Sequence, residues 1–475
     1  MVDGVSTTVY VLVLLAALAV AVGSDGLLRW AAVAVVAAVA VAVSTRSGPT
    51  RIGLLLALVA AGTSPWNAFA FGGLRPADLS LVAAVGLLLL SRRGLGALPN
   101  LVLPGWLLVL TVTVAVLMAG HELFPTDAAF LAQRVQVDAA GLTTTGIFTN
   151  VGIGGRWLVS LLGVPVLCVL VRQHGGVWLA RLALAFVGGA AVSGLVAVTD
   201  GLGLTAISGH FVVPDSGGRQ AGLTVHPNHL AATACLAVPF VFWAFARPGR
   251  RVHVYAAACL VLLLASVYES GSRGGAVCVV LAAALTLVLV KRLRSRLPLV
   301  VGAAFLAMFV VFGFYPDALA HLLTSVRLSG SGGGVDASDQ VRATLQTQGI
   351  ADFRHAPFVG VGLQVGLDAH NIFRQMLAAG GIALFSAFVV FAVGAFRSAL
   401  RVGRVHPLAY AAAASVASWL LFGMVENLLL DRFLYFPAGF IVAMMQRTEV
   451  TGASPAPAPA PAPDPAPDPV PAGRP

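Results

Sequence analysis

Four polar motifs interrupt an otherwise apolar chain, and their side chains are suited to binding an anion and moving a proton. They contain Arg219, His226 and Asn228 in "RQAGLTVHPN", Ser272 and Arg273 in "SGSRGGA", Arg342 in "SDQVRATL", and Asp368, His370 and Asn371 in "DAHNIF". A guanidinium group forms paired hydrogen bonds with phosphate oxygens and stays charged in a poorly hydrated site. An imidazole can act as a general base near neutral pH.

The polar residues that precede apolar runs also have a purely structural interpretation as helix starts. Pro227 suits the first turn of a helix, and Asn228 could cap the free backbone donors of that turn. Asp368 and Asn371 could cap a later helix in the same way, which would leave His370 as a polar residue at the membrane interface. Capping does not explain why Arg219 lies only a few residues before such a start.

The arginines have structural alternatives as well. Arg273 could form a salt bridge with Glu269, four residues earlier, or reach the lipid head groups. Arg342 could be a solvated side chain of a hydrophilic loop. The small residues on both sides of Arg273 would nevertheless let other groups approach its guanidinium closely.

The elements that carry these motifs are predicted to be transmembrane helices. Hydrophobic residues make up 58% of the sequence and charged residues 10%, and the mean hydropathy is +0.92. Apolar runs of about 18 residues or more cross a bilayer as helices. The sequence therefore predicts about fourteen spans, and we expect an N-terminus that is not cleaved. The predicted spans lie near residues 8–23, 27–43, 52–71, 78–91, 101–119, 156–171, 178–198, 228–246, 252–269, 274–290, 297–314, 371–395, 408–424 and 428–445.

The basic residues predict the orientation of these spans, because Lys and Arg near helix ends are held on the cytoplasmic side. Alternate connections carry arginine clusters throughout the chain, such as Arg247, Arg250 and Arg251, so both termini are expected in the cytoplasm. The long connections at 120–155, 199–227 and 315–370 then lie outside. All four polar motifs fall on this outer face.

Charge and cysteine content exclude several other functions. The net charge of +10 is explained by the cytoplasmic arginines, so it does not indicate a nucleic-acid partner. The cysteines all fall within predicted spans without CxxC spacing, which indicates neither disulfides nor a metal site. They are Cys168, Cys235, Cys259 and Cys278. The Pro/Ala-rich tail, residues 451–475, is predicted to be an extended, disordered cytoplasmic segment.

The order and sidedness of the motifs over about residues 215–395 resemble the O-antigen ligase and polymerase superfamily of membrane glycosyltransferases. The segments "RQAGLTVHPN", "SGSRGGA" and "PFVGVGLQVGLDAHNIFRQMLAAGG" carry the resemblance. It implies an all-α, GT-C-like, polytopic membrane protein of about 12–14 helices, whose large outer loop bears short helices. The division expected from it is an N-terminal helical region (1–200), a catalytic membrane region (201–450, with the outer loop 315–370) and the tail (451–475).

The resemblance also implies a reaction in the inner membrane. A glycan would pass from a polyprenyl-diphosphate-linked donor to an acceptor hydroxyl on the outer face, with inversion and without a metal or other cofactor. The acceptor could be a glycan, a lipid or a wall polymer in contact with the bilayer. A polymerase of lipid-linked repeat units would share the motifs. A lipid or glycan transporter is the alternative from another class, but transporters usually place polar residues near the bilayer midplane.

The roles that the resemblance implies follow the residue types. Arg219 and Arg273 would contact the donor diphosphate, and His370 would activate the acceptor hydroxyl or organise the reacting centre. Arg342 in the outer loop would bind an anion or shape the site. The remaining polar residues of the motifs would contact substrate; these are His226, Asn228, Ser272, Asp368 and Asn371.

Overall fold

All regular elements in the described part of the chain are helical, which confirms the predicted all-α fold class. The computed structural model describes residues 48, 50–70, 75–90, 101–134, 150–213, 218–294, 333–364 and 370–446. The predicted spans at 8–23, 27–43 and 297–314, the Pro/Ala-rich tail and Asp368 lie outside these residues.

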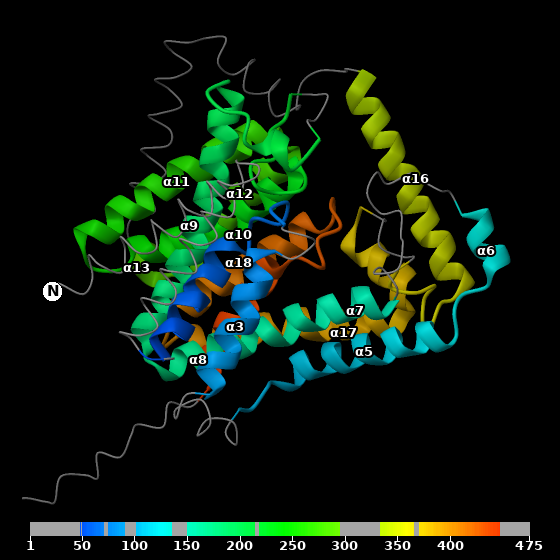
Figure 1. Ribbon diagram of the computed structural model, residues 1–475, viewed down its shortest axis with the longest axis horizontal. Helices are drawn as coiled ribbons and strands as arrows, with labels where there is room; N and C mark the ends of the chain where they lie inside the picture. Colours follow the sequence, from blue (N-terminus) through cyan, green and yellow to red (C-terminus); the bar gives the residue numbers. More distant parts are fainter. Residues whose placement is uncertain are drawn as a thin grey trace, which may run out of the picture.

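The helices follow one another closely along the chain. A first helix, Thr50–Thr63, precedes the labelled elements of Figure 1. These are α3 (Pro76–Leu90), α5 (Gly105–Leu123), α6 (Ala128–Gln133), α7 (Asn150–Leu158), η2 (Val159–Gly163), α8 (Val164–Gln173), α9 (Gly176–Gly201), η3 (Ser208–His210), α10 (Pro227–Phe245), α11 (Arg250–Ser270), α12 (Arg273–Leu289), α13 (Lys291–Arg294), α16 (Gly333–His355), α17 (Ile372–Gly403), α18 (Leu408–Phe422), η4 (Arg432–Tyr435) and α19 (Phe436–Met445).

Among the described residues, six helical segments are long and apolar enough to cross a membrane, and five shorter apolar helices accompany them. Each of these segments overlaps one of the predicted spans within the described residues. The short π-helix η2 joins α7 and α8 into a single segment, Asn150–Gln173. The chain is therefore a multi-pass membrane protein, as its composition predicts.

Helix α10 lies at the centre of the bundle, between α9, α11, α12 and α18 (Figure 1). In its most apolar window 83% of the residues are buried, whereas the corresponding fraction for α11 is 28%. Aromatic side chains fill the centre, where Phe240 packs edge to face on Phe186 and Phe440. Beyond its basic first turn, α11 exposes mainly apolar side chains, among them Val254 and Val261, as a surface that faces lipid requires.

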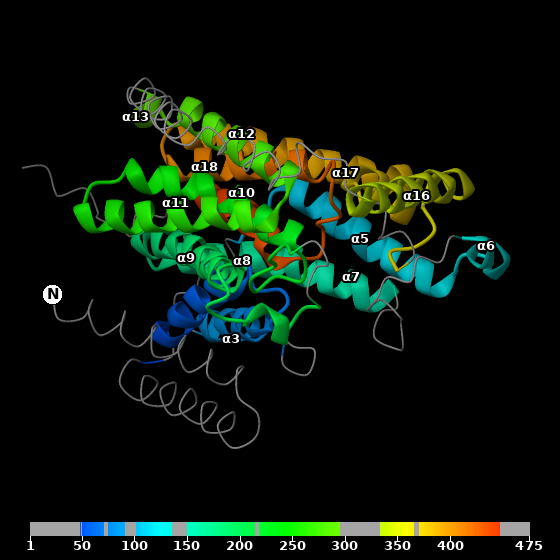
Figure 2. The ribbon, with the colours of Figure 1, turned by 90° about the horizontal axis from the view of Figure 1, so that it is seen from above.

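Helices α5, α7 and α17 extend to one side of the bundle, where α16 and α6 pack at their far end (Figures 1 and 2). The expectation of short helices in the large outer loop is wrong for its described part, which contains the single 23-residue helix α16. No proline interrupts this segment, so nothing in it breaks a long helix. Arg134 forms a two-pronged salt bridge to the buried carboxylate of Asp352, at 2.9 and 2.7 Å, and thereby fixes α16 against the end of α6.

A kink at Gly381 divides α17 into two parts. Gly381 has a φ of +61°, a value that L-residues with a side chain rarely adopt. The kink leaves backbone groups of α17 without helical partners, and the segment 357–362 supplies them. Ile382 N donates to Pro357 O at 2.8 Å, and Val361 N donates to Ala378 O at 2.8 Å. The "PFVGVG" segment thus packs against α17 at the glycine pair that follows "DAHN" in the sequence.

Candidate active site

The first turns of three helices meet at the 423–431 loop, which connects α18 to η4. At the start of α17, Ile372 N donates to Gly423 O at 2.7 Å. At the start of α12, Gly274 packs so closely on the loop that an added Cβ would lie 2.9 Å from Val425 Cγ2. The first turn of α10 reaches the same loop through a side-chain hydrogen bond. Because a helix N-terminus carries a partial positive charge, this junction favours anions.

A chain of hydrogen bonds joins three of the predicted residues through a fourth, Glu426. Arg219 Nη2 donates to Asn228 Oδ1 at 2.7 Å, and Asn228 Nδ2 donates to Glu426 Oε2. On the other oxygen of the same carboxylate, His370 Nδ1 lies 3.1 Å from Glu426 Oε1. Glu426 is only 2% exposed. The structure therefore connects the "RQAGLTVHPN" and "DAHN" motifs through a buried carboxylate that the sequence analysis did not select.

The surroundings of Glu426 keep its carboxylate ionised. Burial alone would raise the pKa of Glu426, but the hydrogen bond from His370 and the charges of His370, His229 and His226 hold it well below its usual range. An ionised carboxylate accepts hydrogen bonds only, so the proton of this contact belongs on His370 Nδ1. When the imidazole is neutral, this arrangement leaves its lone pair on Nε2.

His370 also has an unusual backbone conformation. Its φ of 44° makes it the only non-glycine residue with a positive φ in the described part of the chain. Such a conformation costs on the order of 1–3 kcal/mol and persists where the surrounding contacts impose it. Here the contact with Glu426 and the start of α17 at the next residue but one hold the imidazole in place.

Arg219 is fixed against the turn between α11 and α12. Its Nε donates to Ser270 O at 2.7 Å, and Gln220 N donates to Glu269 O at 3.0 Å. Arg273 is the first residue of α12 and is half-buried beside this turn. The Glu269 carboxylate instead packs against Gly201, and no ion pair between described residues joins it to Arg273. The two arginines thus occur on adjoining segments, and the anticipated Glu269–Arg273 salt bridge does not form.

Three of the predicted substrate-contacting residues act as helix caps. His226 Nδ1 accepts from Asn228 N at 3.1 Å, so His226 caps α10 and leaves the Asn228 side chain for Arg219 and Glu426. Ser272 caps α12 by accepting from Gly275 N at 3.2 Å. Asn371 caps α17 through two backbone donors, at 3.0 and 3.1 Å, and it donates from Nδ2 to Met424 O.

Arg342 lies on α16, outside the hydrogen-bonded chain around Glu426. It is half-buried, one turn before Gln346 and on the same helix face. Gln346 Oε1 accepts from Arg374 Nη1 at 2.8 Å, and Arg374 in turn lies one turn after His370. The face of α16 that carries Arg342 therefore packs against the part of α17 that begins at the site.

A second charged cluster surrounds Asp431 at the far end of the same loop. Its buried carboxylate lies 3.2 Å from Arg75 Nη1 and 3.0 Å from His229 Nδ1. Burial alone would raise the pKa of Asp431, but the hydrogen bond and charge of His229 and the charge of Arg75 lower it well below its usual range. The next residue, Arg432, pairs with Asp78 at 2.7 Å. The N-terminal region thus contributes charged side chains next to the site.

The sequence holds one signal for these missed residues. The segment "MVENLLLDRF" (424–433) places three ionisable side chains in a run that is otherwise mostly apolar, and such residues in a membrane protein are expected to have partners. The partners themselves, His370 and Arg75, lie 56 and 356 residues away in the chain, so no local pattern identifies them.

Residues 258–389 match the family model described as O-Antigen ligase. The matched region includes Ser272, Arg273, Arg342, the described helix of the outer loop and His370, but neither Arg219 nor Glu426. A search of the curated proteins found no match. The family match supports an O-antigen ligase-like or polymerase-like membrane enzyme. It confirms the resemblance of this multi-pass membrane protein to the O-antigen ligase and polymerase superfamily.

Proposed function

We propose that the protein is a membrane glycosyltransferase that moves a glycan from a polyprenyl-diphosphate-linked donor to an acceptor hydroxyl on the outer face of the inner membrane. The observation that carries the proposal is the hydrogen-bonded chain from Arg219 through Asn228 and Glu426 to His370. It joins a cation suited to phosphate and an imidazole suited to proton transfer at one junction of helix starts. The reaction is of the O-antigen ligase type.

The diphosphate end of the proposed site consists of Arg219 and Arg273. Guanidinium groups offer planar, forked donors to phosphate oxygens, and the first turns of α10, α12 and α17 add partial positive charge. As the donor bond breaks, negative charge grows on the leaving diphosphate, and preorganised cations stabilise it. We therefore propose that the arginines take the place of a divalent cation and that the reaction is independent of metal.

The acceptor end of the proposed site is His370. With Nδ1 donating to Glu426, Nε2 removes the proton from the acceptor hydroxyl. The acceptor oxygen then forms a bond to the anomeric carbon while the bond from that carbon to the diphosphate oxygen breaks. The electron pair leaves with the polyprenyl diphosphate, and attack from the opposite side inverts the anomeric centre. Glu426 does not touch the reacting atoms in this scheme; it is a positioning residue that fixes the His370 tautomer.

Arg342 and the capping residues have secondary roles in the proposal. Arg342, on the helix of the outer loop, helps to bind a second anionic part of donor or acceptor. Asn228 holds Arg219 and Glu426 in register, whereas His226, Ser272 and Asn371 set the starts of the three helices. With the orientation predicted by the basic residues, both termini lie in the cytoplasm and the site opens outward.

The test is an assay of the purified protein in nanodiscs with polyprenyl-diphosphate oligosaccharides from the source cells and with EDTA present. We expect release of polyprenyl diphosphate, and His370→Ala and Arg273→Ala should abolish it without reducing expression. Arg273→Lys should also be impaired, because an ammonium group cannot reproduce a forked contact. The matched controls are His210→Ala and Arg354→Lys, which change exposed residues outside the site.

The product sizes separate the two members of the superfamily that share these motifs. A single addition to the acceptor indicates a ligase, and a ladder of repeat units indicates a polymerase. Full release by both alanine variants would overturn the site assignment. Movement of the intact donor across a sealed bilayer, without release, would favour a transporter instead.

A further inference from the structure

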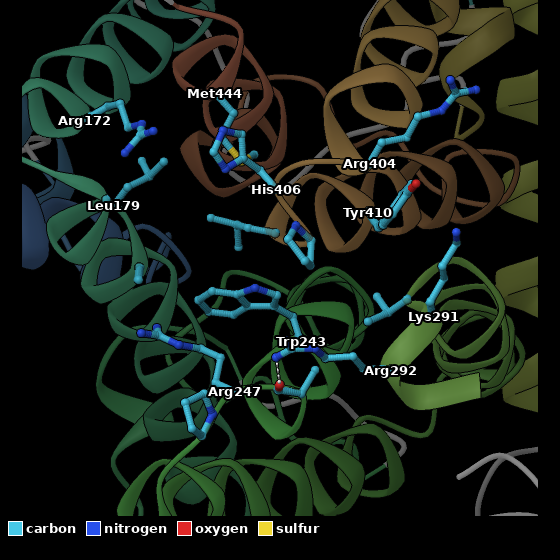
Figure 3. Close-up of a pocket in the computed structure, with 18 residues that line it drawn as sticks. Arg172, Leu179, Trp243, Arg247, Lys291, Arg292, Arg404, His406, Tyr410 and Met444 are labelled. Carbon is cyan, nitrogen blue, oxygen red and sulfur yellow. Dashed lines mark hydrogen bonds between the residues drawn. The ribbon is translucent and has the colours of Figure 1, made fainter. Parts of the chain in front are cut away.

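A cavity of about 590 Å³ lies at the end of the helix bundle opposite to the candidate active site (Figure 3). Helices α10 and α12 begin at the site and end at the cavity, which Trp243 and Val290 line. Helix α18 runs the other way, from Leu408 at the cavity to the 423–431 loop. Along α10, Asn228 at the site and Trp243 at the cavity are separated by about 22 Å, at 1.5 Å per residue. The cavity is therefore distinct from the proposed site of glycosyl transfer.

The wall of this cavity is strongly basic. Five cationic side chains and His406 line it, and no carboxylate occurs among the 18 described residues of the lining (Figure 3). The cations are Arg172, Arg247, Lys291, Arg292 and Arg404. Within the described chain, no ion pair involves Arg172, Arg247, Lys291 or Arg404. A bound anion would therefore find several cations that form no ion pair with a carboxylate of the described residues.

Arg172 is the lining residue that most clearly indicates a ligand with a hydrogen-bond acceptor. Its Nε atom is buried and has no hydrogen-bond partner among the described residues, although an unsatisfied buried donor costs about 1–3 kcal/mol. The guanidinium lies against Gly176, where an added Cβ would be 2.8 Å from Nη1. Burial and the charge of Arg172 lower the pKa of His406, which places these two side chains close together. An anionic oxygen in the cavity would satisfy this donor.

The cavity also has apolar walls, which a small hydrophilic anion would not use. Leu179, Trp243 and Met444 line it and are at least nine-tenths buried. Arg247 lies over the Trp243 ring, 5.0 Å from its centre, in a cation–π contact. The volume falls within the range of pockets for drug-sized ligands, about 300–1,000 Å³. A ligand that combines a phosphate with hydrocarbon fits this lining better than free phosphate does.

We propose that this cavity binds the phosphate head group of an anionic phospholipid from the cytoplasmic leaflet. The cations hold the phosphate, and the apolar walls contact the glycerol backbone and the first part of the acyl chains. Basic pockets between transmembrane helices on the cytoplasmic side are suited to such head groups. Arginines that only set the orientation of the helices need no cavity; Arg250 and Arg401 are of this kind, since both are exposed and outside the lining.

The test is native mass spectrometry of the full chain in a neutral detergent. Dioleoyl phosphatidylglycerol and dioleoyl phosphatidylcholine are the probes, because they share acyl chains and differ in head-group charge. We expect at least about a tenfold preference of the wild-type protein for phosphatidylglycerol. Arg172→Gln combined with Arg404→Gln should lose the preference. Arg250→Gln combined with Arg401→Gln removes the same charge outside the cavity and should keep it.

Further arms distinguish the source of the phosphate and guard against a misfolded variant. Glycerol 3-phosphate should not displace the lipid at equal concentration; equal displacement would overturn the lipid assignment in favour of a soluble phosphate compound. In the wild-type protein alone, the preference should fall as salt concentration rises. The proposal is wrong if salt has no effect, if both lipids bind equally, or if the cavity variant behaves like its control.

Discussion

Replacing the buried Glu426 with Gln tests whether its carboxylate fixes the tautomer of His370, as the proposed mechanism requires. The substitution keeps the size of the side chain and removes its charge. The carboxylate accepts hydrogen bonds from Asn228 and His370 through its two oxygens, whereas an amide offers one acceptor and one donor group. If the amide oxygen stays with Asn228, its nitrogen faces His370 Nδ1. His370 must then accept on Nδ1 and carry its proton on Nε2, where it cannot act as a base.

The expected loss of activity follows from this change of tautomer. General base catalysis contributes about 10²–10⁴-fold to a rate. At about 1.36 kcal/mol for each factor of ten, the activation barrier should rise by about 2.7–5.4 kcal/mol. Stability should change less, because a neutral hydrogen bond of about 0.5–1.5 kcal/mol replaces one to a charged group of about 1.5–3 kcal/mol. We therefore expect a folded protein with a rate reduced by at least about a hundredfold.

The assay compares single-turnover release of polyprenyl diphosphate at saturating donor and acceptor, so that binding and chemistry are separated. A reduced rate with unchanged apparent affinity for both substrates is the expected pattern, since Glu426 contacts neither in the proposed scheme. Melting temperatures in the same nanodiscs show whether the variant is folded. Glu122→Gln is the matched control, because it is the same substitution at an exposed residue away from His370.

A rate within about threefold of the wild type would refute the reasoning, because even the lower end of the general-base contribution is about a hundredfold. So would an equal loss in the Glu122→Gln control, since the effect would then not depend on the contact with His370. If Glu426→Gln weakens donor binding and leaves the chemical step unchanged, the carboxylate acts through Arg219 and the diphosphate end instead.

Three further predictions concern stability. Glu426 and Asp431 have pKa values below the ordinary ones, so their contribution to stability is complete above about pH 5 and is lost progressively as the pH falls through the ordinary carboxyl range toward the lowered values. The melting temperature should therefore fall between about pH 5 and 3, and less so in Asp431→Asn. Arg134→Ala leaves the buried carboxylate of Asp352 without its cation and should destabilise the packing of α16 by about 3–5 kcal/mol. Limited proteolysis within residues 333–364 should then be faster; an unchanged rate would contradict the prediction. Gly381→Ala puts a residue with a side chain at a positive φ and brings its Cβ against the backbone of the 357–362 segment. It should destabilise the protein by at least about 1 kcal/mol and lower the melting temperature. An equal melting temperature would disprove this prediction.

The sequence predicts the membrane helices well because length and hydropathy alone decide whether a segment can span a bilayer. Each predicted span within the described residues has a helix, and the polar residues before α12 and α17 cap those helices as their types suggest. The cap of α10 is His226 and not Asn228, because the Asn228 side chain makes tertiary contacts with Arg219 and Glu426. A propensity for capping carries no information about such competing partners.

The candidate site could be predicted only in part, for a similar reason. Arg219, Arg273 and His370 stand out because each precedes or begins an apolar segment and has no expected role there. Glu426 and Asp431 do not stand out until the fold brings His370 and Arg75 beside them. The length of α16 was missed because its polar sequence has no strong apolar periodicity, so its helical extent depends on packing against α17 and on the contact with the end of α6.

The kink at Gly381 has a mechanical consequence. It detaches the first nine residues of α17 from the rest of the helix and fastens them at both ends to other segments, namely 357–362 and the 423–431 loop. His370 thus directly precedes a short piece of helix that the 357–362 segment holds at one end and the 423–431 loop, beside Glu426, holds at the other. Gln346 on α16 accepts a hydrogen bond from Arg374 in this first part of α17, so α16 contacts the same short piece of helix. The position of this one imidazole is therefore set by contacts with two segments that lie far apart in the sequence.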